Sequence, residues 1–140
     1  MVLCASPGYL AAHGTPTTLA DLARHRVIGY SLSPTGDTLT LQAADGPRSV
    51  RTRPHFHANN GETCRAAALD HQGFVLEPDF LVGADLTAGR LVRVLPELEG
   101  EEVGIYAVYP TRKHLSGKVR ALVDFLAVAF ARPTWRTEDL

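Results

Sequence analysis

The 140-residue sequence predicts an α/β sandwich with a mostly parallel sheet, and two observations lead to this fold class. Short apolar and β-branched runs alternate along the chain with segments whose apolar residues recur at helical spacing. Hydrophobic residues make up 45% and charged residues 21% of the chain, which is typical of a domain that buries its own core.

The first half of the chain should form short strands, short helices and a hairpin. Pro7 and Gly14 mark the ends of elements, and Thr18 followed by Asp21 is a capping-box pattern. The hairpin loop should be longer than a tight Asp-Gly turn, and Pro54 places the second hairpin strand at a sheet edge or ends it. The expected elements are strand 2–6, a helical turn over 8–14, helix 17–26, strand 27–32, turn 33–37, and hairpin strands within 38–43 and 48–58.

The second half should alternate between helices and strands. Gly73 should end the helix that begins near Glu62, and Ser116 can cap the longest helix, whose apolar residues form one stripe. Val92 and Val94 should share one face of a strand. The expected elements are helix 62–72, strand 74–78, one or two helical turns over 79–89, strand 91–95, strand 102–110, helix 114–131 and a frayed tail over 132–140.

Charge and cysteine usage argue against several classes of protein. The formal net charge of −1 lacks the basic excess of a domain that grips nucleic-acid phosphates, so we expect no direct DNA binding by this chain. No apolar run approaches the roughly 20 residues that span a bilayer, and the first residues lack the basic part of a secretory signal. Cys4 and Cys64 should be buried as small apolar side chains. These features predict a cytoplasmic protein without a membrane partner.

Enzyme and metal motifs are scarce. The segment "GYSLS" (29–33) lacks the final glycine of a nucleophile elbow, and neither glycine-rich phosphate loop occurs. His55 and His57 would project from the same face of a strand, but no Cys, Asp or Glu nearby completes a metal site. Partly exposed strand histidines are the favoured interpretation. We expect no enzymatic activity, no metal and no cofactor.

The segment "ANNGE" (58–62) is the strongest candidate for a binding site. Asn59 as N-cap with Glu62 three residues later matches a capping box, which contributes about 1 kcal/mol to helix stability. Capping by Asn59 and Glu62 does not require Asn60 and Gly61. A helix N-terminus with free amides is also suited to binding an anion. From this segment alone, a cap and a binding site are equally favoured.

The order of several motifs resembles the effector-binding domain of LysR-type transcriptional regulators. The segment "VLCASPGYLAAHGTPTTLADLARHRVIGYS" (2–31) is similar to the passage that opens the second lobe in that family. "HANNGETCRAAALDHQGFVLEPDFLVGADLTAGRLVRVLP" (57–96) resembles its continuation, and "IYAVYPTRKHLSGKVRALVDFL" (105–126) resembles the closing strand and helix. The resemblance covers about residues 2–130.

The fold that this resemblance implies is a type II periplasmic-binding-protein-like three-layer α/β sandwich with an incomplete first lobe. Residues 1–95 would form the second lobe, and 96–131 would form the crossing segment with the last strand and helix of the first lobe. The N-terminal winged helix-turn-helix, the linker helix and the first half of the first lobe of the family are expected to be missing. DNA contact would then come only through that missing domain.

The resemblance also implies a small-molecule effector in a cleft between the lobes, with a carboxylate as one candidate. It points to nine lining residues at the hinge, at the helix start and at two strand ends: Ser6, Pro7, Tyr30, Ser31, Asn59, Asn60, Gly61, Pro78 and Phe80. The alternative is a truncated module that only forms homodimers or higher oligomers and shows no ligand response. A stand-alone solute-binding protein is a third and less favoured hypothesis, and an enzyme comes last.

Overall fold

A central layer, made of a three-stranded and a two-stranded sheet, organises the body of the protein. The computed structural model describes residues 1–109 and 116–131. β2 pairs in parallel with β5, whereas β1 pairs antiparallel with both β6 and β7. One parallel bridge between Val27 and Phe74 joins the β2–β5 pair to β6. The strands are β1 (Val2–Ala5), β2 (Ile28–Tyr30), β5 (Phe56–Ala58), β6 (Val75–Glu77) and β7 (Val92–Arg93).

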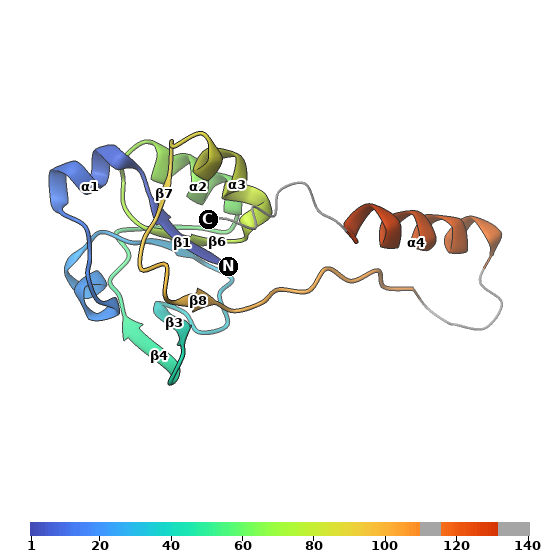
Figure 1. Cartoon of the computed structure of the whole chain (residues 1–140), viewed down its shortest axis with the longest axis horizontal. Helices are drawn as coiled ribbons and strands as arrows, with labels where there is room; N and C mark the ends of the chain where they lie inside the picture. Colours follow the sequence, from blue (N-terminus) through green and yellow to red (C-terminus); the bar gives the residue numbers. More distant parts are fainter. Residues whose placement is uncertain (110–115, 132–140) are drawn as a thin grey trace.

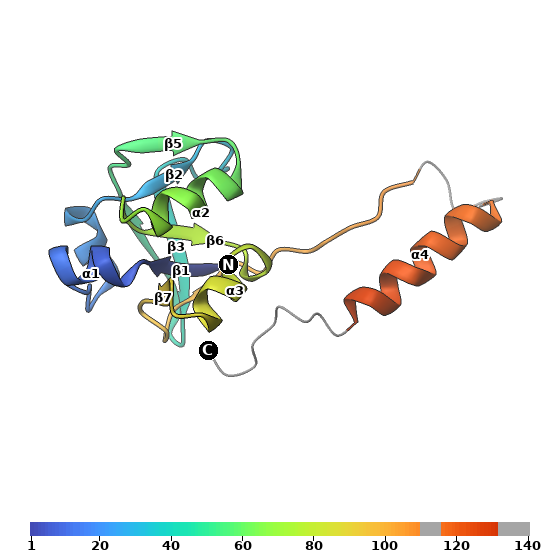
Figure 2. The same ribbon diagram turned by 90° about the horizontal axis from the view of Figure 1, so that it is seen from above.

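Helices and a hairpin cover the two faces of this sheet, so the predicted three-layer α/β sandwich is confirmed. α2 and α3 contact each other and pack over one face (Figure 2). The hairpin of β3 (Thr38–Ala43) and β4 (Gly46–Arg51) lies on the other side (Figure 1), and residues of α1 and the 3-10 helix η1 contribute to the core there. The bounds are α1 (Pro7–His13), η1 (Leu19–Arg24), α2 (Gly61–Leu69), α3 (Asp79–Thr87) and α4 (Gly117–Phe130).

Strand residues alternate between two hydrophobic cores on opposite faces of the sheet. Leu3 and Ala5 of β1 contribute to the core beside α1 and η1, whereas Cys4 between them contributes to the core beneath α2 and α3. Phe74 and Val75 divide between the same two cores. Apolar residues at successive positions are therefore required on both sides of these strands, which explains why β1 and β6 read as continuous apolar runs.

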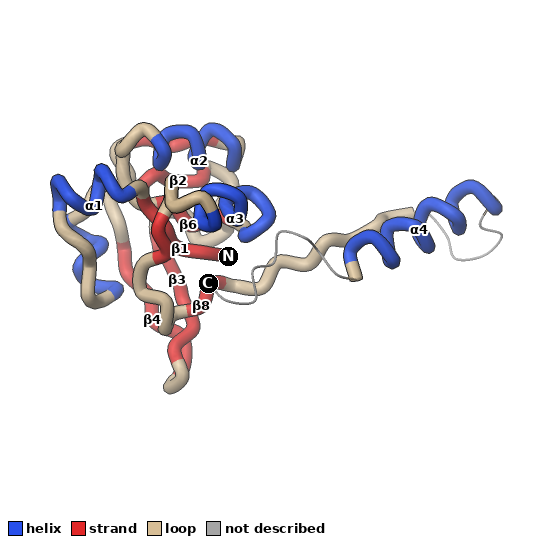
Figure 3. Tube along the Cα trace, turned by 45° about the horizontal axis from the view of Figure 1, so that its top comes forward, coloured by secondary structure: helices blue, strands red, loops and turns tan. Residues whose placement is uncertain are grey.

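The hairpin consists of β3 (Thr38–Ala43) and β4 (Gly46–Arg51), and it projects from the body (Figure 3). Ala43 pairs with Gly46, so the connection has two residues, and the prediction of a longer loop is wrong. Gly46 has φ +125°, a conformation that only glycine adopts without strain, and this permits the tight connection. β8 (Glu99–Gly100) adds to β3 and ties the end of the body to the hairpin.

The prediction of a mostly parallel sheet is wrong for part of the structure. β2 and β5 pair in parallel, but the ladders of β1, of the hairpin and of β8 are antiparallel. The two-residue hairpin turn can only join antiparallel strands. β1 runs against both of its neighbours, a direction that the alternation of strands and helices along the sequence cannot reveal.

Several element boundaries differ from those predicted. The segment after Thr18 forms a 3-10 helix, and the Asp21 carboxylate accepts a 2.8 Å hydrogen bond from the Thr18 backbone amide. α2 ends at Leu69, before the predicted 72, and Gly73 follows with φ +151°. In the strand predicted over 91–95, only Val92 and Arg93 pair with β1, and Val94 is buried whereas Val92 is 40% exposed.

An arm leads away from the body after β8 (Figure 1). Residues 101–109 form no strand, so the predicted strand over 102–109 is wrong. Among residues 1–109 and 116–131, no strand lies beside this segment to complete its hydrogen bonds. α4 is confirmed as the longest helix, and the Ser116 hydroxyl accepts a 3.4 Å hydrogen bond from the Val119 amide. The predictions for Pro110, for His114 and Leu115, and for the tail 132–140 lie outside the described residues.

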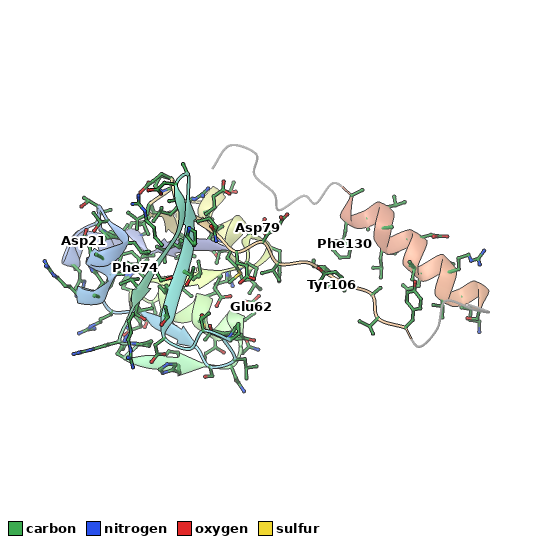
Figure 4. The ribbon with its side chains drawn as sticks, turned by 90° about the horizontal axis from the view of Figure 1, so that it is seen from below. Asp21, Glu62, Phe74, Asp79, Tyr106 and Phe130 are labelled. Atoms are coloured by element: carbon green, nitrogen blue, oxygen red, sulfur yellow. The ribbon has the colours of Figure 1, made fainter. Side chains whose placement is uncertain are left out.

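The side chains of the arm and of α4 are largely exposed. Figure 4 shows Phe74 within the body, whereas Tyr106 and Phe130 lie outside it, on the arm and on α4. Tyr106 is 83% exposed, and Phe125 on α4 is 66% exposed. Within the described residues, no helix is both long and apolar enough to cross a membrane.

Candidate functional site

A cavity of about 420 Å³ opens at the sheet edge where β2 and β6 end. Figure 2 shows β2, β5 and β6 side by side. The wall includes Tyr30 at the end of β2, Glu77 at the end of β6 and Gly61 at the start of α2. The β2–β3 connection and two arm residues, Glu101 and Val103, also contribute to it. Ligands of open α/β sheets bind outside the carboxyl ends of the strands, so this position is typical of a binding site.

Four of the predicted site residues line this cavity: Tyr30, Gly61, Pro78 and Phe80. Ser31 and Asn60 are adjacent in sequence to lining residues, and Asn59 lies two residues before Gly61, but none of the three is part of the wall. The Ser31 amide donates a 2.8 Å hydrogen bond to the Ala58 carbonyl, which holds the end of β2 beside the end of β5. The structure therefore brings together the residues that follow β2, β5 and β6.

Ser6 and Pro7 lie at the opposite end of the sheet. Because β1 runs against β6, Val2 pairs with Glu77, and Ser6 follows the far end of the strand. There the buried Ser6 hydroxyl lies 2.7 Å from Nδ1 of His71. Ser6 and Pro7 therefore do not line this cavity, because β1 runs in the reverse direction, and their part in binding stays a prediction.

Asn60, and not Asn59, caps α2. The backbone of Asn60 is extended, with φ −139° and ψ 123°, and its Oδ1 accepts a 3.2 Å hydrogen bond from the Thr63 amide. The N-cap lies one residue later than predicted, and Asn59 and Glu62 do not form the predicted capping box. Glu62 instead accepts a 3.1 Å hydrogen bond from Nη1 of Arg65 within the helix. The second asparagine, which seemed in excess of a cap, is thus the cap itself.

Glu77 is the most unusual group in the cavity wall, and sequence reasoning missed it. Its side chain is only 4% exposed, and no group of the described residues donates a hydrogen bond to its Oε1 atom. Burial raises the pKa of the Glu77 carboxyl to about 7, a hydrogen bond from Cys64 opposes this shift, and the nearby charge of Glu62 adds to it. A carboxylate at the end of the apolar run "FVLEP", with no basic residue beside it, was the available signal.

Gly61 allows the Glu77 carboxylate to approach the first turn of α2. A Cβ atom at position 61 would lie 2.9 Å from Oε2 of Glu77 and 2.6 Å from Cδ1 of Leu81. Both distances are shorter than ordinary van der Waals contacts. The glycine that suggested close approach of a ligand therefore accommodates a carboxylate of the protein itself.

The Glu77→Gln variant should be more stable than the wild-type protein above neutral pH. The folded-state pKa of Glu77 is raised from about 4.5 to about 7, so the folded protein binds more protons than the unfolded chain between these values. The stability due to protonated Glu77 is complete below pH 4.5 and is lost as the pH rises through 7. We expect a gain of about 2 kcal/mol in the free energy of unfolding at pH 8, measured by urea denaturation.

The same comparison at pH 5 provides the control. At pH 5 Glu77 is largely protonated in the folded protein, so Glu77→Gln should change the free energy of unfolding little. His25 has the opposite effect, since burial lowers its pKa and stability then falls with falling pH. His25 contributes equally to both proteins, so its contribution cancels in the difference between their free energies of unfolding. A difference that is equal at pH 5 and pH 8 would contradict the raised pKa of Glu77.

Two further polar groups near the cavity were also not predicted as site residues. Asp37 of the β2–β3 connection lines the wall, and its Oδ1 atom lies 2.8 Å from Nε2 of His57. The His57 ring packs against Gly29, where a Cβ atom would lie 2.5 Å from Cδ2 of the ring. His57 thus pairs with a carboxylate at the surface, and its side chain is 43% exposed as expected for a strand histidine.

The cysteines lie in the core beneath α2 and α3. Cys4 and Cys64 are both fully buried and unpaired, as predicted. Burial raises the pKa of the Cys4 thiol to about 12 and that of Cys64 to about 11, so neither supplies a thiolate near neutral pH. In the described part of the chain, no three His, Cys, Asp or Glu side chains are arranged to hold a metal ion.

A layered α/β fold with a cavity at the strand ends is an arrangement that many small-molecule-binding domains share. The family model of the LysR substrate binding domain matches residues 1–131, and the chain therefore belongs to this family. This confirms the family resemblance found in the sequence. The curated relatives are named as transcriptional regulators, so the family is one of regulators and not of enzymes.

Two relatives illustrate the similarity. The chain is 37% identical over 137 residues to the HTH-type transcriptional regulator PtxR of Pseudomonas aeruginosa, covering 96% of this chain and 43% of PtxR. It is 36% identical over 123 residues to the regulator CrgA of Neisseria meningitidis, covering 87% of this chain and 41% of CrgA. The chain thus spans less than half the length of these curated relatives.

Solved structures agree with this assignment. The CrgA regulatory domain of Neisseria meningitidis superposes with a TM-score of 0.78 at 34% identity, covering 91% of this chain and 63% of that domain. Full-length AphB, a virulence activator of Vibrio cholerae, gives a TM-score of 0.78 at 30% identity, covering 89% of this chain and 43% of AphB. The predicted fold is therefore that of LysR regulatory domains.

Proposed function

We propose that this chain is the effector-sensing portion of a LysR-type transcriptional regulator, and that it binds a small metabolite in the cavity at the ends of β2 and β6. The main support is the cavity itself, whose volume of about 420 Å³ falls within the range of small-molecule sites. DNA would be contacted through a winged helix-turn-helix domain outside this chain. Because its relatives are named as regulators of transcription, we place this activity in the cytoplasm.

Residues 1–95 would act as the second lobe, 96–131 as the crossing segment with the last strand and helix of the first lobe, and 132–140 as a tail. Glu101 and Val103 of the arm line the cavity together with Gly61 and Phe80. A ligand that contacts both sides would favour one position of the arm relative to the body. Such a ligand shifts the equilibrium only as far as its affinity differs between the two arrangements.

Ligand binding can be tested with Phe80→Ala. Phe80 lines the cavity and is 48% exposed, so its removal should reduce affinity without unfolding the chain. A library of small metabolites is screened against ¹⁵N-labelled protein, and we expect hits that move the amide signals of Gly61, Glu77 and Phe80. Affinity should fall about tenfold in Phe80→Ala, as expected for an aromatic contact that the bound ligand covers.

Phe56→Ala is the matched control. Phe56 is an exposed phenylalanine of β5, at 38% exposure, and it does not line the cavity. This variant should bind the hits as the wild type does. An equal loss of affinity in both variants, or hits that move only signals remote from the cavity, would argue against a site at this position.

The alternative function is a dimerisation module without ligand response, and the exposed apolar residues of the arm and α4 favour it. Leu122, Phe125 and Val128 of α4 are 57%, 66% and 78% exposed. Apolar patches of this kind often mark contacts between proteins, and a homodimer or higher oligomer would cover them. Sedimentation equilibrium of the wild type and of Phe125→Glu distinguishes the two functions. Self-association that Phe125→Glu abolishes, together with no response to the library, would favour the module.

A further inference from the structure

Every charged side chain that lines the cavity is acidic, although the Met1 residue with its backbone ammonium also lines it. Three carboxylate side chains line it, those of Asp37, Glu77 and Glu101, and within the described residues no lysine, arginine or histidine side chain does so. The Met1 ammonium lies nearby and donates a 3.1 Å hydrogen bond to the Glu101 carbonyl. An anionic ligand in this cavity would therefore meet like charges without a cationic side chain to offset them.

Glu77 lines this cavity, and its buried carboxylate has unused hydrogen-bonding capacity. Glu77 is a lining residue, it is 4% exposed, and its Oε1 atom accepts no hydrogen bond from the described residues. A buried polar atom without a partner is costly, so a ligand that supplies a donor there gains more than it would at an exposed carboxylate. The missing partner is a hydrogen-bond donor, preferably one with a positive charge.

The first turn of α2 already has a negative group beside it. Oε2 of Glu77 lies so close to Gly61 that a Cβ atom there would be 2.9 Å away. The amide of Thr63 in the same turn is occupied by Asn60. A carboxylate ligand would thus have to displace or neutralise Glu77 to use the positive end of this helix.

Aromatic side chains stand on the same wall. Tyr30 and Phe80 line the cavity and remain 41% and 48% exposed. Aromatic faces attract cations through their ring quadrupoles, most strongly where water is partly excluded. Ile28, Leu76 and Leu81 add apolar surface for a carbon skeleton.

We propose that the cavity takes a small organic cation, an amine whose ammonium group pairs with the Glu77 carboxylate while its carbon skeleton packs near Tyr30 and Phe80. This inference rests on the proposed function, since it names the ligand class of the same site. It replaces the carboxylate effector that the helix N-terminus suggested.

Three probes with one carbon skeleton test the charge preference: benzylammonium, benzyl alcohol and benzoate. Each is titrated into the ¹⁵N-labelled 140-residue chain at pH 8, and the amide signals of Gly61, Glu77 and Phe80 are followed. We expect benzylammonium to bind about tenfold more tightly than the neutral and anionic probes, as for an ion pair in a partly desolvated site. Its affinity should fall about tenfold in Glu77→Gln, whereas that of benzyl alcohol should not fall.

Glu97→Gln is the matched control, because it removes the same charge from an exposed glutamate that does not line the cavity. The affinity for benzylammonium should be unchanged in this variant. In the wild type it should also rise between pH 6 and pH 8, because burial raises the pKa of Glu77 to about 7 and the pair requires an ionised carboxyl. The other titratable groups around Glu77 are Glu62 and Cys64 of α2, the Met1 ammonium, and Asp37 and Glu101 of the wall. Glu77→Gln should abolish the rise in benzylammonium affinity between pH 6 and pH 8.

The outcomes separate the inference from the proposed function. If benzoate moves the cavity signals at equal or lower concentration than benzylammonium, the cavity binds small molecules but the cationic preference is refuted. Benzylammonium binding that is undiminished in Glu77→Gln also refutes it. If no probe and no metabolite moves these signals, both the inference and the proposed function fail.

Discussion

Gly73→Ala should destabilise the protein by about 4 kcal/mol and leave a large fraction of the chain unfolded at 37 °C. Gly73 has φ +151°, and a Cβ atom there would lie 2.4 Å from the Arg26 carbonyl oxygen. The colliding atom belongs to the backbone, so no side-chain rotation relieves the contact. The Arg26 carbonyl also accepts a 3.0 Å hydrogen bond from the Phe74 amide, beside the bridge that joins β2 to β6.

Gly36→Ala is the control for Gly73→Ala, because it introduces backbone strain without a steric clash. Gly36 has φ +57°, and nothing lies within 4 Å of the position that its Cβ atom would take. This variant should lose about 1 kcal/mol, the usual cost of a side chain in a left-handed conformation. Urea denaturation monitored by circular dichroism measures both variants. Equal losses at the two positions would show that the contact with Arg26 relaxes without breaking the bridge.

Asp85→Ala should cost about 3 kcal/mol of unfolding free energy. Asp85 of α3 is fully buried, and its carboxylate accepts a 2.5 Å hydrogen bond from Nε of Arg65 on α2 and a 2.7 Å hydrogen bond from Nε of Arg90. Burial alone would raise the pKa of Asp85, but the two arginines outweigh it and the pKa is lowered. Removing the carboxylate leaves two guanidinium groups beside each other and separates α2 from α3.

Asp45→Ala is the control for this variant. Asp45 pairs with Arg48 at 2.9 Å, but both side chains are exposed, at 70% and 58%. Exposed pairs of this kind contribute little, so the denaturation midpoint should not change measurably. If Asp85→Ala lowers the free energy of unfolding no more than Asp45→Ala does, water replaces the buried carboxylate without strain. Both variants keep the cavity residues intact, so ligand binding by the folded fraction should persist.

Local signals in the sequence predicted most of the elements. Thr38–Ala43 forms the strand that its alternating pattern indicates, and Gly14 ends α1 with φ +84° as a glycine terminator should. These features depend on neighbouring residues, whose identities the sequence states directly. The family resemblance then supplied the layered fold, because the order of several motifs is more specific than any one of them.

The direction of pairing was not predictable in the same way. Nothing within "VLCAS" indicates that β1 runs against β6, and this direction places Ser6 and Pro7 at the end of the sheet away from the cavity. The role of Glu77 also depends on tertiary structure, because a strand-end glutamate becomes buried only when α2 and α3 pack beside it. The segment 102–109 has the composition of a strand, but strand formation requires a partner edge that the described residues do not offer it.

The antiparallel pairing of β1 with strands far along the chain has a consequence for synthesis on the ribosome. Residues Val2–Ala5 are synthesised before their strand partners in the described part of the chain, β6 and β7, which end at Glu77 and Arg93. At typical elongation rates, roughly ten seconds pass before both partners have been synthesised. During this time an apolar strand stays unpaired, which makes it a natural target for a chaperone that holds nascent chains until the sheet can close around it.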